Sequence, residues 1–277
     1  MNLYEKEKTK NYKDNKKNKK HKKINDNVNN NDSNSGEFIK GKQHKDALNA
    51  AFIKSIKLNK WFYFSLFVCF SIFKFQDFIL LSKSSTYTGF VFSFLFILIL
   101  GHLVHRLSHN INFTQVYDNH KKNNMNPYID SILSNVCTFL DFHRTTHHNS
   151  DINKKTINIF YEFINNFLTQ GGILIIFIWF CNRYIDMRVV LLWALMYATA
   201  HNINYMIIKP TVHRDHHLHD DTNYGLDIAD IIFDTKFDIH DVEDHNHISI
   251  NLIVITLIII LFDTASLFFT KVKHFLV

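Results

Sequence analysis

The sequence predicts an all-α polytopic membrane protein with about four transmembrane helices, a fifth apolar stretch whose crossing stays open, and a helical cap on one face. Two observations predict this class. Apolar residues gather in separate stretches, several of them near the ~20 residues that cross a bilayer core as a helix. The mean hydropathy of −0.09 resembles that of a soluble protein only because a very polar N-terminal segment offsets a very apolar remainder.

The N-terminal segment, residues 1–46, is rich in Lys, Asn and Asp and has almost no large apolar residue. Such a segment buries too little surface to offset its ordering entropy, so we expect a disordered tail followed by a membrane-embedded domain over residues 47–277. The basic run 16–23 could meet anionic lipid, nucleic acid or a sorting receptor, but a solvated tail is the favoured interpretation. No nucleic-acid partner is therefore expected.

Five apolar stretches follow the tail. The first two are each close to the length of one membrane crossing, whereas the third is short and contains Gln170, Gly171 and Gly172. Asp263 lies near the end of the fifth, so its crossing stays open. The stretches cover residues 61–81, 87–105, 167–180, 189–208 and 248–269.

A polar segment, residues 110–166, separates the second and third stretches and carries helical order. Its apolar residues recur at intervals of three and four: Ile129, Ile132, Leu133, Val136, Phe139 and Leu140. An amphipathic helix lying in the membrane interface would place His143 and His147 just beyond its apolar face.

The three cysteines, Cys69, Cys137 and Cys181, are scattered and form no C-x-x-C pair. This spacing argues against a disulfide framework and against a thiolate metal site.

Histidines instead gather beside the apolar stretches. Neutral imidazole is the commonest protein ligand for transition metals, and residues three or four apart share one helix face. The clusters are His102, His105 and His109; His143, His147 and His148; and His201, His213, His216 and His217, of which the last three form an H-x-x-H-H box.

Topology tests whether these clusters can meet. The Lys-rich tail should stay cytoplasmic by the positive-inside rule. Two crossings then return the chain to the cytoplasm at 102–109, segment 110–166 stays there, and the third and fourth stretches bring 201 and 213–217 back to that side. All the clusters are thus predicted on one membrane face.

About ten imidazoles exceed what one tetrahedral ion needs, so the set predicts two ions. Almost no Glu lies among them, but nearby aspartates could orient ligand histidines by accepting the second ring N–H. These aspartates are Asp141, Asp151, Asp215, Asp220 and Asp221, although an exposed loop carboxylate is the commoner reading for each. Solvent-exposed or hydrogen-bonded histidine is also expected at His219, His240, His245 and His247.

The ordered set of histidines resembles the fatty acid hydroxylase and sterol desaturase superfamily. The matching residues are His105-Arg-Leu-Ser-His109, His143-Arg-Thr-Thr-His147-His148, His201-Asn-Ile-Asn, His213-Arg-Asp-His216-His217, Asn223-Tyr224-Gly225 and the Asp230-Ile-Ile-Phe-Asp-Thr segment, within residues 95–238. The resemblance implies a membrane enzyme with two metal ions, usually iron and in some members zinc. Such an enzyme uses dioxygen and external electrons to attack an unactivated lipid C–H bond.

The same resemblance implies the metal ligands His105, His109, His143, His147, His148, His201, His213, His216 and His217. The second box departs from the usual pattern, because three residues rather than two separate His143 from the following pair. His143 is thus a weaker match than His147 and His148, and for His102 the ligand and core readings are balanced. Asn223 to Gly225 would hold the third box against the metals.

Hydroxylation of a fatty acyl chain or sterol is the favoured activity, with desaturation second. The electron donor would be a carrier such as cytochrome b5 with its reductase, attracted by the basic tail, and a eukaryotic host would place the enzyme in the endoplasmic reticulum. A His-rich metal transporter is a rival, but transporters place ligands near the bilayer midplane within broken helices. A non-catalytic membrane scaffold is the other alternative.

Overall fold

A computed structural model describes residues 33–80, 85–121, 126–148, 156–178, 184–208, 210–219 and 221–276. Within these ranges the structure is helical and contains no strand. The chain divides into two compact units, residues 1–48 and 49–277. Helix α2, Ser33–Leu58, begins inside the segment expected to be disordered, and its only helix-weakening residues from 33 onward are Gly36 and Gly41. Residues 1–32 of that segment lie outside the described residues.

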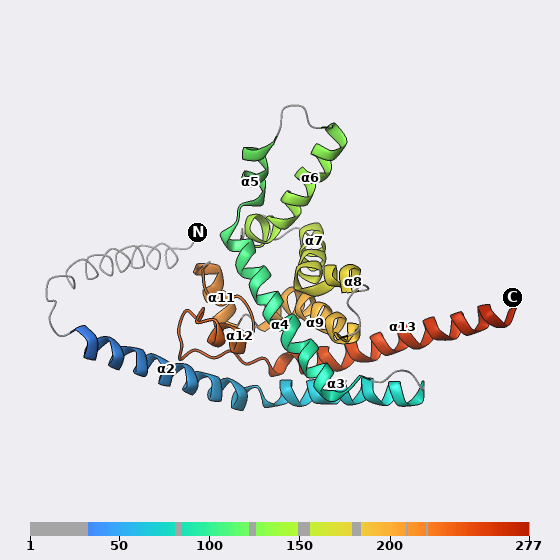
Figure 1. Cartoon of the computed structure of the whole chain (residues 1–277), viewed down its shortest axis with the longest axis horizontal. Helices are drawn as coiled ribbons and strands as arrows, with labels where there is room; N and C mark the ends of the chain where they lie inside the picture. The colour runs from blue at the N-terminus through green and yellow to red at the C-terminus, as the bar shows by residue number, and fades with distance from the viewer. Residues whose placement is uncertain are drawn as a thin grey trace. The chain divides into compact units, whose positions relative to one another are not determined.

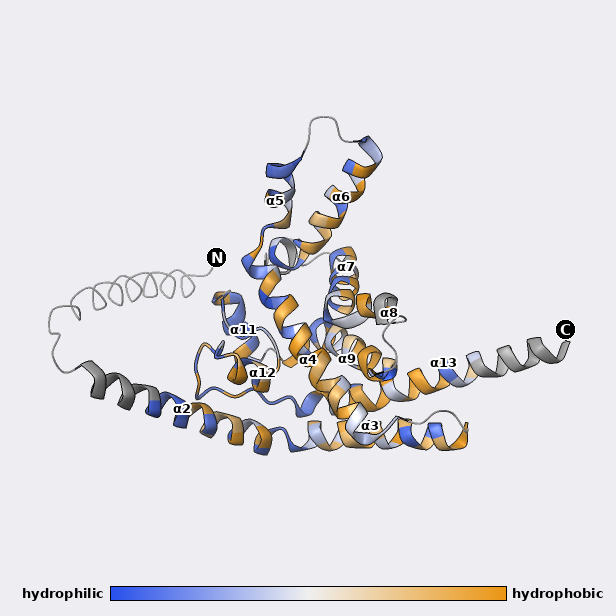
Figure 2. Ribbon diagram, in the orientation of Figure 1, coloured by the Kyte–Doolittle hydropathy of each residue, from blue (hydrophilic) through white to orange (hydrophobic). Residues whose placement is uncertain are grey.

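Three helices among the described residues are long and apolar enough to cross a bilayer. They are α3 (Lys60–Ile79), α4 (Tyr87–Asn110) and the segment Asn246–Ser266, which contains the start of α13 (Ser249–Leu276). The fifth predicted stretch, whose crossing the sequence left open, is therefore a candidate span. Figure 2 shows all three as predominantly hydrophobic ribbons.

The third and fourth predicted stretches lie on broken helices that are not among these candidate spans. One is built from α7 (Thr156–Phe167), η2 (Leu168–Gly172) and α8 (Ile173–Ile178), and the other from α9 (Met187–Thr199), η3 (Ala200–Asn204) and α10 (Tyr205–Ile208). The π-helical turns η2 and η3 interrupt the regular hydrogen-bonding pattern, a feature often found at functional sites.

Gly171 accounts for one of these breaks. Its φ of +132° is a conformation that other residues rarely adopt, and a Cβ there would lie 2.7 Å from Cδ1 of Ile97. The backbone of η2 can therefore pack closely against α4 only with glycine at this position.

The core forms where α3, α4, α9 and α13 pack together (Figure 1). Its fully buried side chains include Phe62 and Phe73 from α3, Phe90 from α4, Trp193 from α9 and Leu252 from α13. Between helices that cross a bilayer, close packing of such side chains, rather than their removal from water, stabilises the contact.

The relative direction of α3 and the α13 segment follows from hydrogen bonds that join their N-terminal ends to each other and their C-terminal ends to each other. At the N-terminal ends of α3 and of the α13 segment, Trp61 N donates to Asn246 Oδ1 at 2.9 Å. Near their C-terminal ends, Gln76 Nε2 donates to Asp263 Oδ2 at 2.9 Å. These two helices therefore run parallel, side by side as in Figure 1.

A buried ion-pair network ties α9 to this second end. Arg188 binds Asp77 of α3 at 2.7 Å and Asp186 at 2.8 Å, and it also donates to Gln76 at 3.1 Å. Helix α9 runs from this network toward His201, and α4 runs in the same sense toward His105 and His109. The histidine-bearing ends of α4 and α9 thus lie opposite the network, as the topological argument requires.

Beyond α4, helices α5 (Phe113–His120) and α6 (Pro127–Leu140) form a hairpin that stands apart from the core of its unit in Figure 1. Exposed apolar side chains follow one another along α6: Tyr128, Ile129, Ile132, Leu133 and Val136. This is the amphipathic helix predicted from the periodicity. The short helices α11 (Thr211–Leu218) and α12 (Asp227–Ile232) come next, and residues 233–248 lead back to α13.

Candidate metal centre

Four histidines from three separate segments gather at the C-terminal end of α4. They are His105 and His109 of α4, His143 of η1 (His143–His147) and His216 of α11. Each offers one ring nitrogen, and these four nitrogens all lie within 4.8 Å of one another. We call these residues the four-histidine group.

The distances within the group suit a shared ion. His105 Nε2 lies 2.9 Å from His143 Nε2 and 3.2 Å from His109 Nε2. Nitrogen ligands about 2.0 Å from a tetrahedral ion are about 3.3 Å apart, so the observed contacts match that spacing closely. The three Nε2 atoms are therefore close enough together to share one ion.

Backbone carbonyls set the tautomer of two members. Nδ1 of His105 is hydrogen-bonded to the Tyr224 carbonyl, and Nδ1 of His216 to the Thr222 carbonyl at 2.7 Å. Because a carbonyl can only accept, each Nδ1 carries the proton and each Nε2 keeps its lone pair. Nε2 of His216 is buried without a hydrogen-bond partner, which is the arrangement of a metal-ligating histidine oriented from behind.

The loop that provides both carbonyls is fixed from within. Asn223 has a φ of +53°, and its side chain donates to Val212 of α11 at 3.3 Å and accepts from the Phe237 N–H at 3.1 Å. Asp230 of α12 accepts the N–H groups of Tyr224 at 2.8 Å and Gly225 at 3.2 Å. Through its carbonyls the loop thus contacts both His105 of α4 and His216 of α11.

Four more predicted histidines lie beside the four-histidine group. His217 Nε2 is 3.1 Å from His213 Nε2, and ring centroids are 4.5 Å apart for His148 and His217 and 4.6 Å apart for His201 and His213. The ring centroid of His148 also lies 4.9 Å from that of His216, which belongs to the four-histidine group. We call His148, His201, His213 and His217 the second histidine group. The side chain of His147 lies outside the described residues.

The π-helical turns carry part of both groups. His143 begins η1 and His201 lies in η3, so each comes from a turn where the chain departs from α-helical spacing. The extra residue in the second box therefore does not exclude His143, which joins His105 and His109.

Glu162 of α7 is a site residue that the sequence reasoning missed. Its Oε1 lies 3.1 Å from Nδ1 of His201, and the Asn166 side chain, four residues later on the same helix face, lies 3.2 Å from that nitrogen. Both side chains are buried. A Glu and an Asn spaced by four on an amphipathic helix were the available signal.

Burial keeps His148, His216 and His217 neutral. Desolvation, followed by the neighbouring His217 and His109, lowers the pKa of His148 to about 2. Desolvation is also the main cause that lowers the pKa of His217 to about 4 and the pKa of His216 well below its ordinary value. Neutral imidazole is the form that binds a metal ion.

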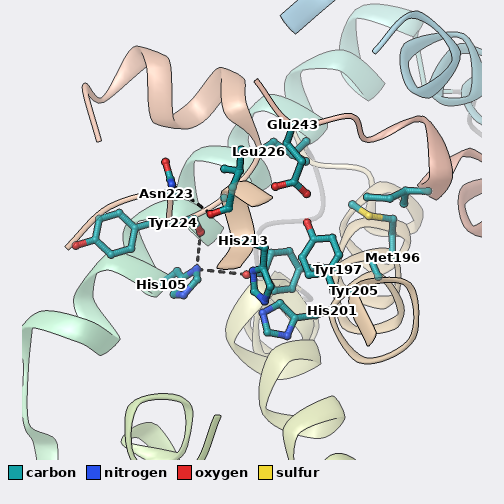
Figure 3. Close-up of a pocket in the computed structure, with 14 residues that line it drawn as sticks. His105, Met196, Tyr197, His201, Tyr205, His213, Asn223, Tyr224, Leu226 and Glu243 are labelled. Atoms are coloured by element: carbon teal, nitrogen blue, oxygen red, sulfur yellow. Dashed lines mark hydrogen bonds between the residues drawn. The ribbon is translucent and has the colours of Figure 1, made fainter. Parts of the chain in front are cut away.

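A small cavity lies between the two groups and the loop (Figure 3). Its volume is about 20 Å³, enough for one water-sized molecule, and His105, His201 and His213 line it. The Tyr197 hydroxyl lies beside it, 3.3 Å from Nδ1 of His105. Leu226 forms part of its wall.

Two other residues considered from the sequence, His102 and Asp141, contact parts of the fold outside the four-histidine group. The ring of His102 stacks on Phe233 with centroids 4.7 Å apart, and its Nδ1 lies 3.6 Å from Asp230, so it is not in the four-histidine group. Asp141 accepts the N–H groups of Phe113 and Thr114 at the start of α5.

Among the described residues, neither Asp215 nor Asp221 accepts a hydrogen bond from a ligand histidine. Asp215 is 3.9 Å from Arg214, and Asp221 is exposed. Asp151 and Asp220 lie outside the described residues.

A buried polar cluster near α13 was also missed. His245 is buried 3.6 Å from Glu243 and 4.0 Å from Asp227, which in turn pairs with Lys236. Burial, then Asp227, raises the pKa of Glu243 to about 8, and burial lowers the pKa of His245 to about 4. Of the two environments predicted for these histidines, solvent or a polar partner, His245 is buried beside carboxylates and His240 is exposed.

No protein-family model matches this chain, and comparisons with curated proteins and with solved structures found no match either. The chain is thus a helical protein with three candidate spans among its described residues and a buried four-histidine group that could hold a metal ion.

Proposed function

We propose that this protein is a membrane-bound di-iron oxygenase that hydroxylates a C–H bond of a fatty acyl chain or sterol. The observation that carries the proposal is the four-histidine group, in which α4, η1 and α11 direct ring nitrogens at one volume. The order of the histidine boxes, which resembles that of the fatty acid hydroxylase and sterol desaturase superfamily, supports the chemistry.

The proposed ligands divide into two sets. The four-histidine group would hold one ion, and the second histidine group, which adjoins it at His148 and His216, would hold the other. Imidazole suits iron as well as zinc, so the ligand set fits either metal. When bound, the iron would supply activation of dioxygen with electrons from outside the protein.

The residues of this chain would orient the ligand histidines and exclude bulk water from the metal ions. The Thr222 and Tyr224 carbonyls hold His216 and His105 in the tautomer that leaves Nε2 available. Glu162 orients His201 in the same manner. The cavity of about 20 Å³ restricts access to small molecules, and burial keeps bulk water from the ligand nitrogens.

The location of the site also supports a lipid substrate. His105 and His109 lie in the last turns of α4, at one end of a candidate span rather than at its middle. A transporter would need ligands near the bilayer midplane, so this position favours the enzyme. We further propose a cytoplasmic orientation in the endoplasmic reticulum and an electron donor such as cytochrome b5 with its reductase.

Elemental analysis of the full chain purified in detergent tests the proposal. We expect about two iron ions per chain, from the two-ion argument, and loss of metal in a His216→Ala, His217→Ala double variant. The matched control replaces two exposed histidines, His120→Ala and His240→Ala, and should retain the metal.

Other outcomes discriminate the alternatives. Two zinc ions would keep a metal transporter in contention, which flux assays in vesicles would decide. Absence of metal in the wild-type protein after metal supplementation would refute catalysis and favour a scaffold. With iron present, lipid analysis of expressing cells separates an alcohol product from an alkene.

A further inference from the structure

An apolar groove runs along α3 and α4 on the face that these spans present to lipid. Its volume is about 390 Å³, within the ~300–1,000 Å³ usual for ligand pockets. Its lining is apolar and aromatic, and the only polar side-chain atoms in it are the hydroxyls of Tyr63 and Tyr87. The full set of lining residues is Tyr63, Leu66, Phe67, Phe70, Tyr87, Val91, Phe94, Leu95, Leu98, Leu226 and Ile228.

The groove has a floor and a rim. Phe70, Leu66 and Leu98 are buried beneath it, whereas Val91 and Leu95 are about half exposed along its edge. The lining residues of α4 extend from Tyr87 to Leu98, which spans about 16 Å at 1.5 Å per residue. That is roughly half of the ~30 Å hydrocarbon core of a bilayer.

Leu226 connects this groove with the candidate metal centre. It is among the residues that line the groove. It also lines the small cavity beside His105, His201 and His213 (Figure 3). It is buried, and it follows Tyr224, whose carbonyl orients His105, by two residues. Leu226 is thus shared by the apolar groove and the small cavity beside the histidines.

We infer that this groove binds one acyl chain of a membrane lipid, with the chain end against Leu226. Both walls of the groove belong to candidate membrane spans, so hydrocarbon chains are the molecules that surround it. Its floor of Leu66, Phe70 and Leu98 gives no polar partner for a headgroup. A polar ligand would lose its hydration there without compensation.

Leu226 would set how far a chain reaches toward the metal centre. That the bound lipid is the substrate rests on the proposed function, whereas binding in the groove does not. Leu226 is then the residue that decides which carbon of the chain lies nearest to the histidines.

Photolabelling in lipid nanodiscs tests the inference. The full chain is reconstituted with a phosphatidylcholine that carries a diazirine at the end of one acyl chain, irradiated, digested and mapped by mass spectrometry. Labelling should be stronger on the peptide containing Leu226 than on the lipid-facing side of α13, where Leu257 and Leu261 are exposed.

Two matched variants sharpen the result. Leu95→Trp adds a bulky ring at the groove rim and should reduce labelling at Leu226 by about tenfold. Leu257→Trp makes the same change on the exposed face of α13 and should leave that labelling unchanged. Val91→Trp is a second groove variant should Leu95→Trp not fold, as judged by circular dichroism.

Absence of label at Leu226, or equal labelling in the groove variants and the wild type, would overturn the inference. The readout needs no metal and no turnover. Labelling at Leu226 in a protein without metal would therefore refute the proposed function alone, and a metal-loaded protein without that label would refute the groove alone.

Discussion

Asp230 is the residue whose removal most directly tests how the candidate metal centre is held. It contacts no proposed ligand in the four-histidine group, yet it accepts the Tyr224 and Gly225 N–H groups and the Thr235 hydroxyl at 2.7–3.2 Å. Those bonds fix the loop whose carbonyls orient His105 and His216. We predict that Asp230→Ala loosens this loop and weakens metal retention.

The magnitude follows from two opposing effects. Two buried N–H groups would lose their acceptor, which costs about 1–3 kcal/mol each, or about 2–6 kcal/mol in total. Burial raises the pKa of Asp230 to about 6, so ionising this carboxyl inside the protein costs about 3 kcal/mol at alkaline pH, and the alanine variant avoids that cost. The net change in unfolding free energy at pH 8 therefore lies between a gain of about 1 kcal/mol and a loss of about 3 kcal/mol.

The sign of the pH dependence follows from the raised pKa. Between about 3.8 and 6 the folded protein binds more protons at Asp230 than the unfolded chain, so its contribution to stability falls as pH rises. The deficit of Asp230→Ala should thus be larger at pH 5 than at pH 8. Loss of a direct partner of a ligand histidine lowers metal affinity by about 10–100-fold. Because Asp230 acts only through the loop that carries those partners, the fall expected for Asp230→Ala is at most of that size.

The assay is metal titration of the purified variant with thermal unfolding measured in parallel. Asp221→Ala is the matched control, because Asp221 is close in the sequence but exposed. Wild-type metal affinity in Asp230→Ala would refute the argument that the loop carbonyls orient the ligands. An equal loss in Asp221→Ala would show that charge near the site, rather than the loop, is responsible.

Three further predictions concern low pH, the Arg188 ion-pair network and the hairpin of α5 and α6. Because burial lowers the pKa of His217 to about 4, the unfolded chain takes up its proton first, and stability and bound metal should both fall as pH drops from about 6.5 to 4. Arg188→Met leaves Asp77 and Asp186 buried without their cation and should lower the unfolding free energy by about 3–5 kcal/mol, seen in thermal unfolding, with metal per folded chain unchanged. Tyr128→Trp on the exposed apolar face of α6 should give a fluorophore that brominated lipids quench.

Each of these has a result that would contradict it. Metal retained undiminished at pH 4 would exclude proton competition at the ligands. An Arg188→Met variant as stable as the wild type would show that the ion-pair network adds nothing to the bundle. A Tyr184→Trp variant, exposed in a polar turn, is the control for the hairpin, and equal quenching at both positions would contradict interfacial insertion of α6.

The sequence alone predicted the helical class, the candidate spans and the set of histidines. Spans are visible because a bilayer demands ~20 apolar residues in succession, a local requirement that any sequence window can reveal. The histidine boxes are visible because ligands on one helix face must recur at three or four residues. Two predicted stretches nevertheless form broken helices, interrupted by the π-helical turns η2 and η3. At η2 the break contains Gly171, which packs against Ile97 of α4.

Only the tertiary structure decided which histidines meet and what orients them. His102 and His105 are one turn apart on α4, yet His105 joins the four-histidine group and His102 stacks on Phe233. Glu162 lies on a different helix from His201, 39 residues away, so its own spacing does not name the histidine that it meets. Asp230 follows Tyr224 and Gly225 by only six and five residues, but the fold decides that its carboxylate accepts their N–H groups. Residue identity and spacing determine that imidazole ligands are present. The tautomer and direction of each ring depend instead on partners that only folding brings within hydrogen-bond distance.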